Sequence, residues 1–237
     1  ALNLGRLAAH DPAACAQMLD RAGGAPAPTD ADEPTLDEIV AERTGLLTAY
    51  QDTDYAALYT KLVTTIRTAE AKLPGAPQKL SGAVARYAHK LMAYKDEYEV
   101  GRLYSNGTFQ KKVEGLFEGD YKIRYHLAPP LLAKKDPETG HLRKQEFGSW
   151  VLGMFKILSR LKFLRGTAFD IFGRTEERKM ERQLIEDYRL LAEEVANSLN
   201  SSNIDLAKQL LSLPEEIRGF GHVKEANVVQ VRKSWQA

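Results

Sequence analysis

The side chains with the clearest chemical potential in this sequence are basic residues in two connections that contain glycine. Arg165 and Arg174 lie in a stretch that ends at Thr175, where a long helix is expected to begin. Arg218 and His222 enclose the second stretch, Gly-Phe-Gly. Guanidinium groups and helix N-termini both bind anions, so Arg165, Arg174, Arg218 and His222 form a candidate anion- or ligand-binding site. The alternative is structural: two capped connections with buried aromatic side chains, namely Phe169, Phe172 and Phe220.

Two other groups could take part in acid–base or metal chemistry. Asp96 and Glu99 are one helical turn apart, as in a metal-binding or acid–base pair. Charge runs on helices are usually solvated, which favours ion pairs with Lys95 and Arg102 instead. His126 is a candidate acid–base group by residue type, but its phase in the chain favours a place on a polar face. A hydrolase built on His126 or Asp96 would need a second titratable group in the same pocket.

The standard cofactor and catalytic motifs are absent from the sequence. It contains neither of the two glycine-rich nucleotide-binding motifs, Gly-x-Gly-x-x-Gly after a strand and Gly-x-x-x-x-Gly-Lys-Ser/Thr. It also lacks His-Glu-x-x-His, Cys-x-x-Cys and Gly-x-Ser-x-Gly. One cysteine, Cys15, cannot form an internal disulfide, a four-cysteine zinc site or an iron–sulfur cluster by itself. We therefore expect no catalytic residue, metal ion or cofactor in this segment.

Composition places the chain among ordinary globular proteins. Of its 237 residues, 27% are charged and 43% are hydrophobic, and the net charge is +1. That balance gives no overall field that would attract nucleic acid or acidic lipid. The apolar runs are too short to cross a bilayer and no signal peptide is recognisable, so we expect a cytoplasmic protein. Because the chain begins at Ala1 rather than Met, we expect an excised segment of a longer polypeptide.

The elements that must position these residues are mostly helices. Residues 1–22 read as a short helical tail, residues 23–34 as a linker rich in Pro, Gly and acidic residues, and residues 35–237 as one helical domain. Apolar spacings of three and four predict helices near 36–50, 54–73, 82–104, 109–117, 147–164, 175–199, 203–211 and 222–235. The helix at 147–164 is expected to have one apolar side, made of Phe147, Trp150, Val151, Met154, Phe155, Leu158 and Leu161.

One segment follows strand spacing. Tyr121, Ile123, Tyr125 and Leu127 alternate with polar residues, and Pro129-Pro130 ends the pattern. An isolated strand needs a partner, which residues 141–146 supply after a turn at 134–140. The expected fold class is therefore mainly α, a multi-helix orthogonal or bundle-like domain with one small β-hairpin.

Several segments together resemble a known enzyme family. They are Leu91–Val100, Phe117–Tyr121 with His126–Leu132, Arg165–Asp170 and Leu213–Glu225. In combination they resemble the C-terminal region of the fused indolepyruvate ferredoxin oxidoreductases. Residues Ala1–Arg21 look like the tail of the γ-type oxidoreductase domain that precedes that region.

The resemblance implies a parent enzyme that oxidatively decarboxylates aryl 2-oxoacids to acyl-CoA, with ferredoxin as electron acceptor. Thiamine diphosphate, iron–sulfur clusters and coenzyme A are implied for other parts of that enzyme, and no catalytic residue carries over to this segment. The implied role is a structural or interaction domain that contacts other domains or subunits, with a homo-oligomer as one form of assembly. The alternative is an anion- or coenzyme-A-binding regulatory module in the same enzyme.

Overall fold

The chain is mainly α-helical. The computed structural model describes residues 8–21, 34–75, 78–117, 119, 121–127, 143–219 and 221–236. Within these ranges the one sheet is a two-stranded antiparallel hairpin, which confirms the predicted fold class. The chain divides into two units, Ala1–Thr35 and Leu36–Ala237. Among the described helices, none combines the length and apolar character needed to span a membrane.

The first unit contains the helix that the sequence predicts after Asp11. Helix α2 (Pro12–Arg21) begins at proline, and the Asp11 carboxylate accepts a hydrogen bond of 2.9 Å from the Ala14 amide. Cys15 on this helix is buried. The predicted linker, apart from residue 34, lies outside the described residues.

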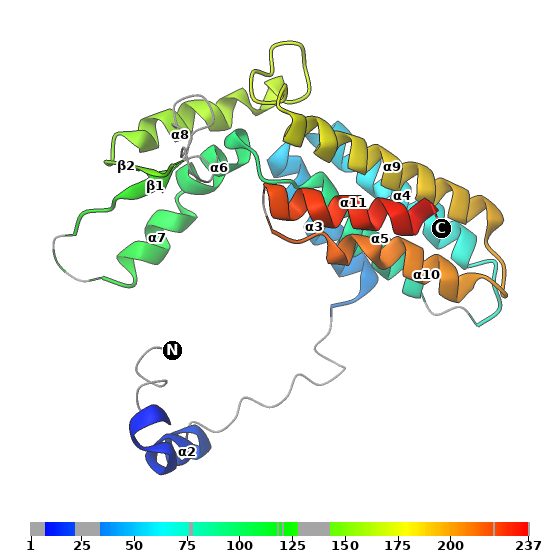
Figure 1. The fold of residues 1–237 in the computed structure, drawn as a ribbon, viewed down its shortest axis with the longest axis horizontal. Helices are drawn as coiled ribbons and strands as arrows, with labels where there is room; N and C mark the ends of the chain where they lie inside the picture. The colour runs from blue at the N-terminus through cyan, green and yellow to red at the C-terminus, as the bar shows by residue number, and fades with distance from the viewer. Residues whose placement is uncertain are drawn as a thin grey trace. The chain divides into compact units, whose positions relative to one another are not determined.

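The second unit has a bundle of helices as its main core (Figure 1). Its members are α3 (Leu36–Tyr50), α4 (Thr53–Glu70), α5 (Lys79–Met92), α9 (Glu176–Ser198), α10 (Ile204–Ser212), the short 3₁₀ turn η3 (Leu213–Glu216) and α11 (His222–Gln236). Apolar residues at helical spacing bury one face of each helix and supply the favourable free energy of packing. The most deeply buried include Leu47, Tyr59, Ile66, Leu80, Val84, Leu184, Tyr188, Leu211, Val228 and Val231.

Side-chain caps set several helix ends. Asp52 begins α4 by accepting from the Tyr55 amide at 2.8 Å, where the sequence predicts the start. Thr175 likewise precedes α9 as its N-cap. Glu70, at the end of α4, is 2% exposed and accepts from the amides of Leu80 and Ser81 at the start of α5. A buried carboxylate thus satisfies the first amides of the next helix.

A smaller group of elements has its own core. It comprises α6 (Glu97–Ser105), α7 (Thr108–Glu114), strands β1 (Tyr125–Leu127) and β2 (Gln145–Phe147), α8 (Val151–Arg160) and the 3₁₀ turn η2 (Leu161–Leu164). Tyr125, Val151 and Phe155 are buried at its centre. The strands pair Tyr125 with Phe147 and His126 with Glu146, so the predicted hairpin is confirmed while its predicted turn lies outside the described residues.

The prediction of one continuous helix over 82–104 was wrong. The chain leaves α5 after Met92 and begins α6 at Glu97. The Asp96 carboxylate caps α6 by accepting from the Glu99 amide at 2.8 Å. The hydroxyls of Tyr55 and Tyr50 donate to the carbonyls of Met92 and Tyr94, at 2.9 and 3.1 Å. The break therefore leaves these backbone groups hydrogen-bonded.

His89 gives the bundle a dependence on pH. Burial, followed by the nearby Arg43 guanidinium, lowers its pKa from the ordinary 6.5 to about 4. Arg43 Nη1 lies 3.5 Å from Nδ1 and can only donate, so this contact is compatible with the neutral ring accepting at Nδ1. The unfolded chain binds a proton near pH 6.5 and the folded chain only near pH 4, so stability falls as the pH falls through this window.

We expect His89 to lower the free energy of unfolding by about 1–2 kcal/mol between pH 7 and pH 4. This is less than the value obtained by converting the full pKa difference to free energy, because solvent screens part of the ring. Urea denaturation of the native chain and of His89→Asn at both pH values measures it. The variant keeps an acceptor for Arg43 and should lose less stability on acidification. Parallel losses in the two proteins would contradict this assignment.

Candidate functional site

Three large apolar side chains at helix α8 face solvent. Trp150, Met154 and Ile157 follow one another at intervals of four and three residues, which places them on one side of the helix. Their exposed fractions are 61%, 41% and 61%. A neighbouring side of the helix, with Val151 and Phe155, faces the small core. Trp150 and Met154, which were predicted to share one side of the helix with Val151 and Phe155, are thus exposed while those two are buried, and α8 carries apolar side chains on two sides.

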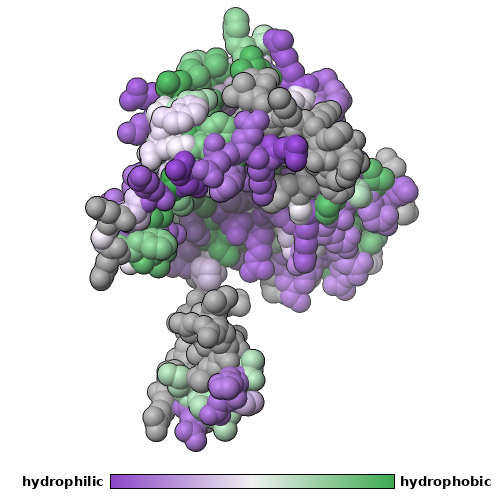
Figure 2. Space-filling view, turned by 60° about the vertical axis from the view of Figure 1, so that its left-hand side comes forward, coloured by the Kyte–Doolittle hydropathy of each residue, from purple (hydrophilic) through white to green (hydrophobic). Residues whose placement is uncertain are grey.

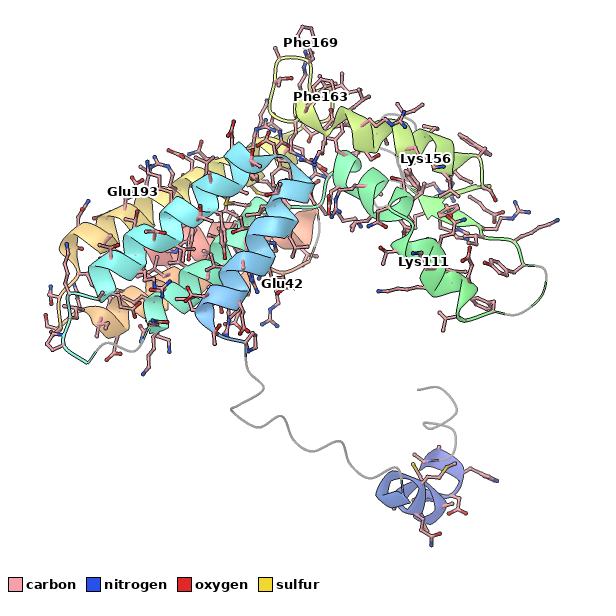
Figure 3. The ribbon with its side chains drawn as sticks, turned by 180° about the vertical axis from the view of Figure 1, so that it is seen from behind. Glu42, Lys111, Lys156, Phe163, Phe169 and Glu193 are labelled. Atoms are coloured by element: carbon pink, nitrogen blue, oxygen red, sulfur yellow. The ribbon has the colours of Figure 1, made fainter. Side chains whose placement is uncertain are left out.

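The connection after α8 extends this exposed set. Phe163 on η2 is 63% exposed and Phe169 is 76% exposed, and Figure 3 shows both projecting from the connection between α8 and α9. The structural alternative predicted Phe169 to be buried, which was wrong; Phe172 instead packs edge-on against Tyr98, with ring centroids 5.4 Å apart. We call Trp150, Met154, Ile157, Phe163 and Phe169 the α8 surface.

The loop that presents Phe169 is held by one buried carboxylate. Asp170 is 3% exposed and accepts hydrogen bonds from the amides of Gly166 and Gly173, each at 2.8 Å. It also accepts from the Tyr98 hydroxyl at 3.1 Å. Gly166 has φ of +76°, a conformation that favours glycine. Phe169 is thus exposed on a loop with defined internal hydrogen bonds.

The charged residues of the segment that carries the α8 surface are of one sign. From Phe147 to Phe169 the sequence has no acidic residue. Lys156 and Arg160 are exposed on α8 itself, whereas the Lys162 ammonium donates to the carbonyls of Thr48 and Ala49 at the end of α3. The space-filling view, which brings this part of the unit forward, shows hydrophobic and hydrophilic residues side by side (Figure 2). A complementary surface would be apolar with acidic groups at its edge.

A buried ion pair joins the connection after α8 to the bundle. Arg165 donates from Nε and Nη2 to Asp96 at 2.5 and 3.0 Å, and from Nη1 to the Tyr50 carbonyl at 2.7 Å. Its guanidinium carbon lies 3.7 Å from the centre of the Tyr50 ring. The two side chains are 5% and 3% exposed. Arg165 therefore ties together the C-terminus of α3, the N-terminus of α6 and the η2 turn.

Helices α6 and α8 are in direct backbone contact at Gly101. A Cβ atom added there would lie 2.9 Å from both the Leu158 Cβ and the Phe155 carbonyl oxygen. Beside this contact the Tyr104 ring stacks on Phe155 and meets Tyr125 edge-on, at centroid distances of 5.1 and 5.6 Å. The exposed side of α8 is thus carried by a closely packed helix pair.

The four candidate anion-binding residues have different environments. Arg165 is used by the buried ion pair, and Arg174 is exposed and donates to the Ala168 carbonyl at 2.9 Å. Arg218 lines a pocket beside α5 and α9 that contains neither Arg165 nor Arg174. His222 begins α11. The structure therefore does not gather these arginines into one site, although it gives Arg218 a pocket with other cations.

The remaining candidates for chemistry have structural roles. Glu99 forms the predicted ion pair with Arg102, with two contacts of 2.7 Å. The prediction of a solvated face was wrong, because the Glu99 and Arg102 side chains are only 13% and 23% exposed and Asp96 is buried against Arg165. His126 is exposed on β1, opposite Glu146. Over the residues that the structure describes, no cluster of three His, Cys, Asp or Glu side chains could hold a metal ion.

Sequence reasoning missed two features of functional interest. The exposed side of α8 carried a signal, since its apolar residues cover more than one helical stripe. No sequence signal pointed to the lysines of the Arg218 pocket, because Lys90 and Lys95 are far from Arg218 in sequence and only the fold brings them together.

Comparison with known proteins yields one match. A model for a family of unknown function, DUF6537, matches residues 36–237. No curated protein and no solved structure matches the chain.

Proposed function

We propose that this chain, which belongs to the family of unknown function DUF6537, is an interaction domain that docks to the rest of a larger enzyme through the α8 surface. The observation that carries the proposal is the exposure of Trp150, Met154, Ile157, Phe163 and Phe169 on a closely packed helix pair and a hydrogen-bonded loop. Large exposed apolar side chains on well-packed elements are typical of protein interfaces.

The partner that we propose is the catalytic part of an indolepyruvate ferredoxin oxidoreductase. The sequence resemblance supports this choice, and the absence of acidic residues from 147 to 169 supports a partner surface with acidic groups. In this proposal the cytoplasmic parent enzyme decarboxylates aryl 2-oxoacids to acyl-CoA, using thiamine diphosphate, iron–sulfur clusters, coenzyme A and ferredoxin. The chain contributes no catalytic group and fixes the position of neighbouring domains or subunits.

Binding measurements on purified proteins test the proposal. The chain is titrated by isothermal calorimetry into the catalytic part of such an oxidoreductase, and the triple variant W150S/M154S/I157S is titrated in parallel. Because anchors at the centre of an interface dominate affinity, we expect the variant to bind at least about tenfold more weakly.

The control variant L58S/L190S/V229S removes three side chains with similar exposure, 57%, 50% and 55%, from α4, α9 and α11. It should bind like the native chain. Equal weakening by the two triple variants would contradict a role for the α8 surface. Self-association of the chain that W150S/M154S/I157S abolishes would assign the surface to a homo-oligomer contact and overturn the proposed partner.

A further inference from the structure

A pocket on the bundle, separate from the α8 surface, combines cations with an apolar wall. It has a volume of about 320 Å³ and lies between the end of α5, the middle of α9, residues 217–219 and Lys224. Leu91, Tyr94, Leu184 and Ile217 form much of its apolar part. This volume accommodates a small organic molecule rather than a single ion.

The charged residues of the pocket are mostly cationic. Lys90, Lys95, Arg218 and Lys224 line it with one acidic residue, Glu181, and the Glu215 carboxylate lies 3.9 Å from Arg218 beside it. Glu181 is 3% exposed and is already paired with Lys224 and with Arg178. Its negative charge is therefore shared between two cations, and the pocket keeps an excess of positive charge.

The cations are held at the pocket by specific contacts. Lys90 donates to the carbonyls of Pro214 and Glu215, at 2.8 and 3.1 Å, which orders the end of a flexible side chain. Backbone carbonyls do not neutralise the ammonium charge, and an ammonium has a third donor. Arg218 is 74% exposed, with only a 3.9 Å contact to the Glu215 carboxylate and a 3.3 Å bond to its carbonyl. An incoming anion can therefore recruit Arg218 without breaking a buried pair.

The backbone next to Arg218 is constrained at Gly219. Gly219 has φ of +83°, and a Cβ atom there would lie 2.9 Å from Val223 Cγ1. Both the conformation and the close contact require glycine. Lys224 follows on α11 and reaches Glu181 on α9, so the two ends of the loop bring their cations to the same pocket.

We propose that this pocket binds a small organic anion, with its phosphate or carboxylate group near Lys90, Arg218 and Lys224 and its apolar body against Leu91, Leu184 and Ile217. This site is independent of docking through the α8 surface. An anion-binding regulatory module was the alternative role predicted from the sequence, and this pocket keeps Arg218 from that candidate site. Lysines take the place of Arg165 and Arg174.

Calorimetric titration of the full chain at low ionic strength tests the site, with phenyl phosphate, benzoate, inorganic phosphate and phenol as probes. We expect saturable binding of phenyl phosphate or benzoate, the tighter one identifying the head group. Inorganic phosphate should bind more weakly because it cannot use the apolar wall, and neutral phenol should not bind. Binding of phenol as tight as that of the anions, or no saturable binding of either aromatic anion, would overturn the proposal.

A matched pair of variants locates the site. Arg218→Gln should weaken binding about three- to fivefold, the range for an exposed charge contact, while Arg174→Gln should leave it unchanged. Both residues are exposed, so neither substitution should affect folding, and urea denaturation checks this. Unchanged binding in Arg218→Gln, or equal weakening in the two variants, would place the anion elsewhere.

Discussion

Replacing Arg165 with methionine is expected to lower the free energy of unfolding by about 3–5 kcal/mol. Methionine fills similar space but leaves the Asp96 carboxylate buried without its partner, and it also removes the donor to the Tyr50 carbonyl. A buried charge without a partner is among the costliest single changes in a protein. Chemical denaturation followed by circular dichroism measures the loss.

The exposed pair Arg67–Asp37 provides a matched control. Its shortest contact is 2.6 Å, close to the 2.5 Å of Arg165–Asp96, but both partners are exposed. Arg67→Met should therefore leave stability nearly unchanged, because solvent screens an exposed pair. If the two substitutions have the same effect, burial does not determine the importance of Arg165. Arg165→Lys should recover only part of the loss, because a lysine cannot make both contacts to Asp96 and stack on Tyr50.

Replacing Gly101 with valine is expected to destabilise the chain by about 1–3 kcal/mol and to separate α6 from α8. The new side chain would overlap the Leu158 Cβ and the Phe155 carbonyl, and a backbone atom cannot move aside as the end of a side chain can. Hydrogen exchange measured by mass spectrometry should show faster exchange in both helices.

Gly153→Ala is the control for this substitution. Gly153 lies in α8, and a Cβ atom there would meet nothing within 4 Å. Alanine is the better helix former, so this variant should be as stable as the native chain or up to about 1 kcal/mol more stable. Normal stability and exchange in Gly101→Val would contradict the close helix contact.

Much of the fold could be predicted because its signals are local. Asp52 and Thr175 are capping residues directly before apolar spacing, and α4 and α9 begin where they predict. The alternation at 121–127 required a partner strand, and β2 supplies it. The break between α5 and α6 had a local signal as well, since Asp96 and Glu99 have the spacing of a capping box. The continuous apolar stripe across 80–98 outweighed that signal.

The surface and the pocket depend on tertiary contacts and so were harder to predict. Met154 and Phe155 are adjacent apolar residues, and nothing in their types says which one the hairpin and α6 will cover. Arg165 and Arg218 are both arginines beside glycine, but one is 5% exposed and the other 74%. The difference arises from Asp96 and Tyr50, which are distant in sequence. Arg165 is part of a buried ion pair because the fold brings the Asp96 carboxylate next to it.

Fluorescence quenching of Trp150 in the assembled enzyme tests docking through the α8 surface most directly. The variant Trp235→Phe leaves Trp150 as the only tryptophan of the chain, and acrylamide quenching reports its access to solvent. Trp150 is 61% exposed in the chain alone, so we expect strong quenching of its fluorescence there. The partner is the catalytic part of the oxidoreductase with its own tryptophans replaced by phenylalanine. When this partner is bound, the docking proposal predicts quenching of Trp150 that is at least severalfold weaker. Binding that leaves the quenching of Trp150 unchanged would contradict it.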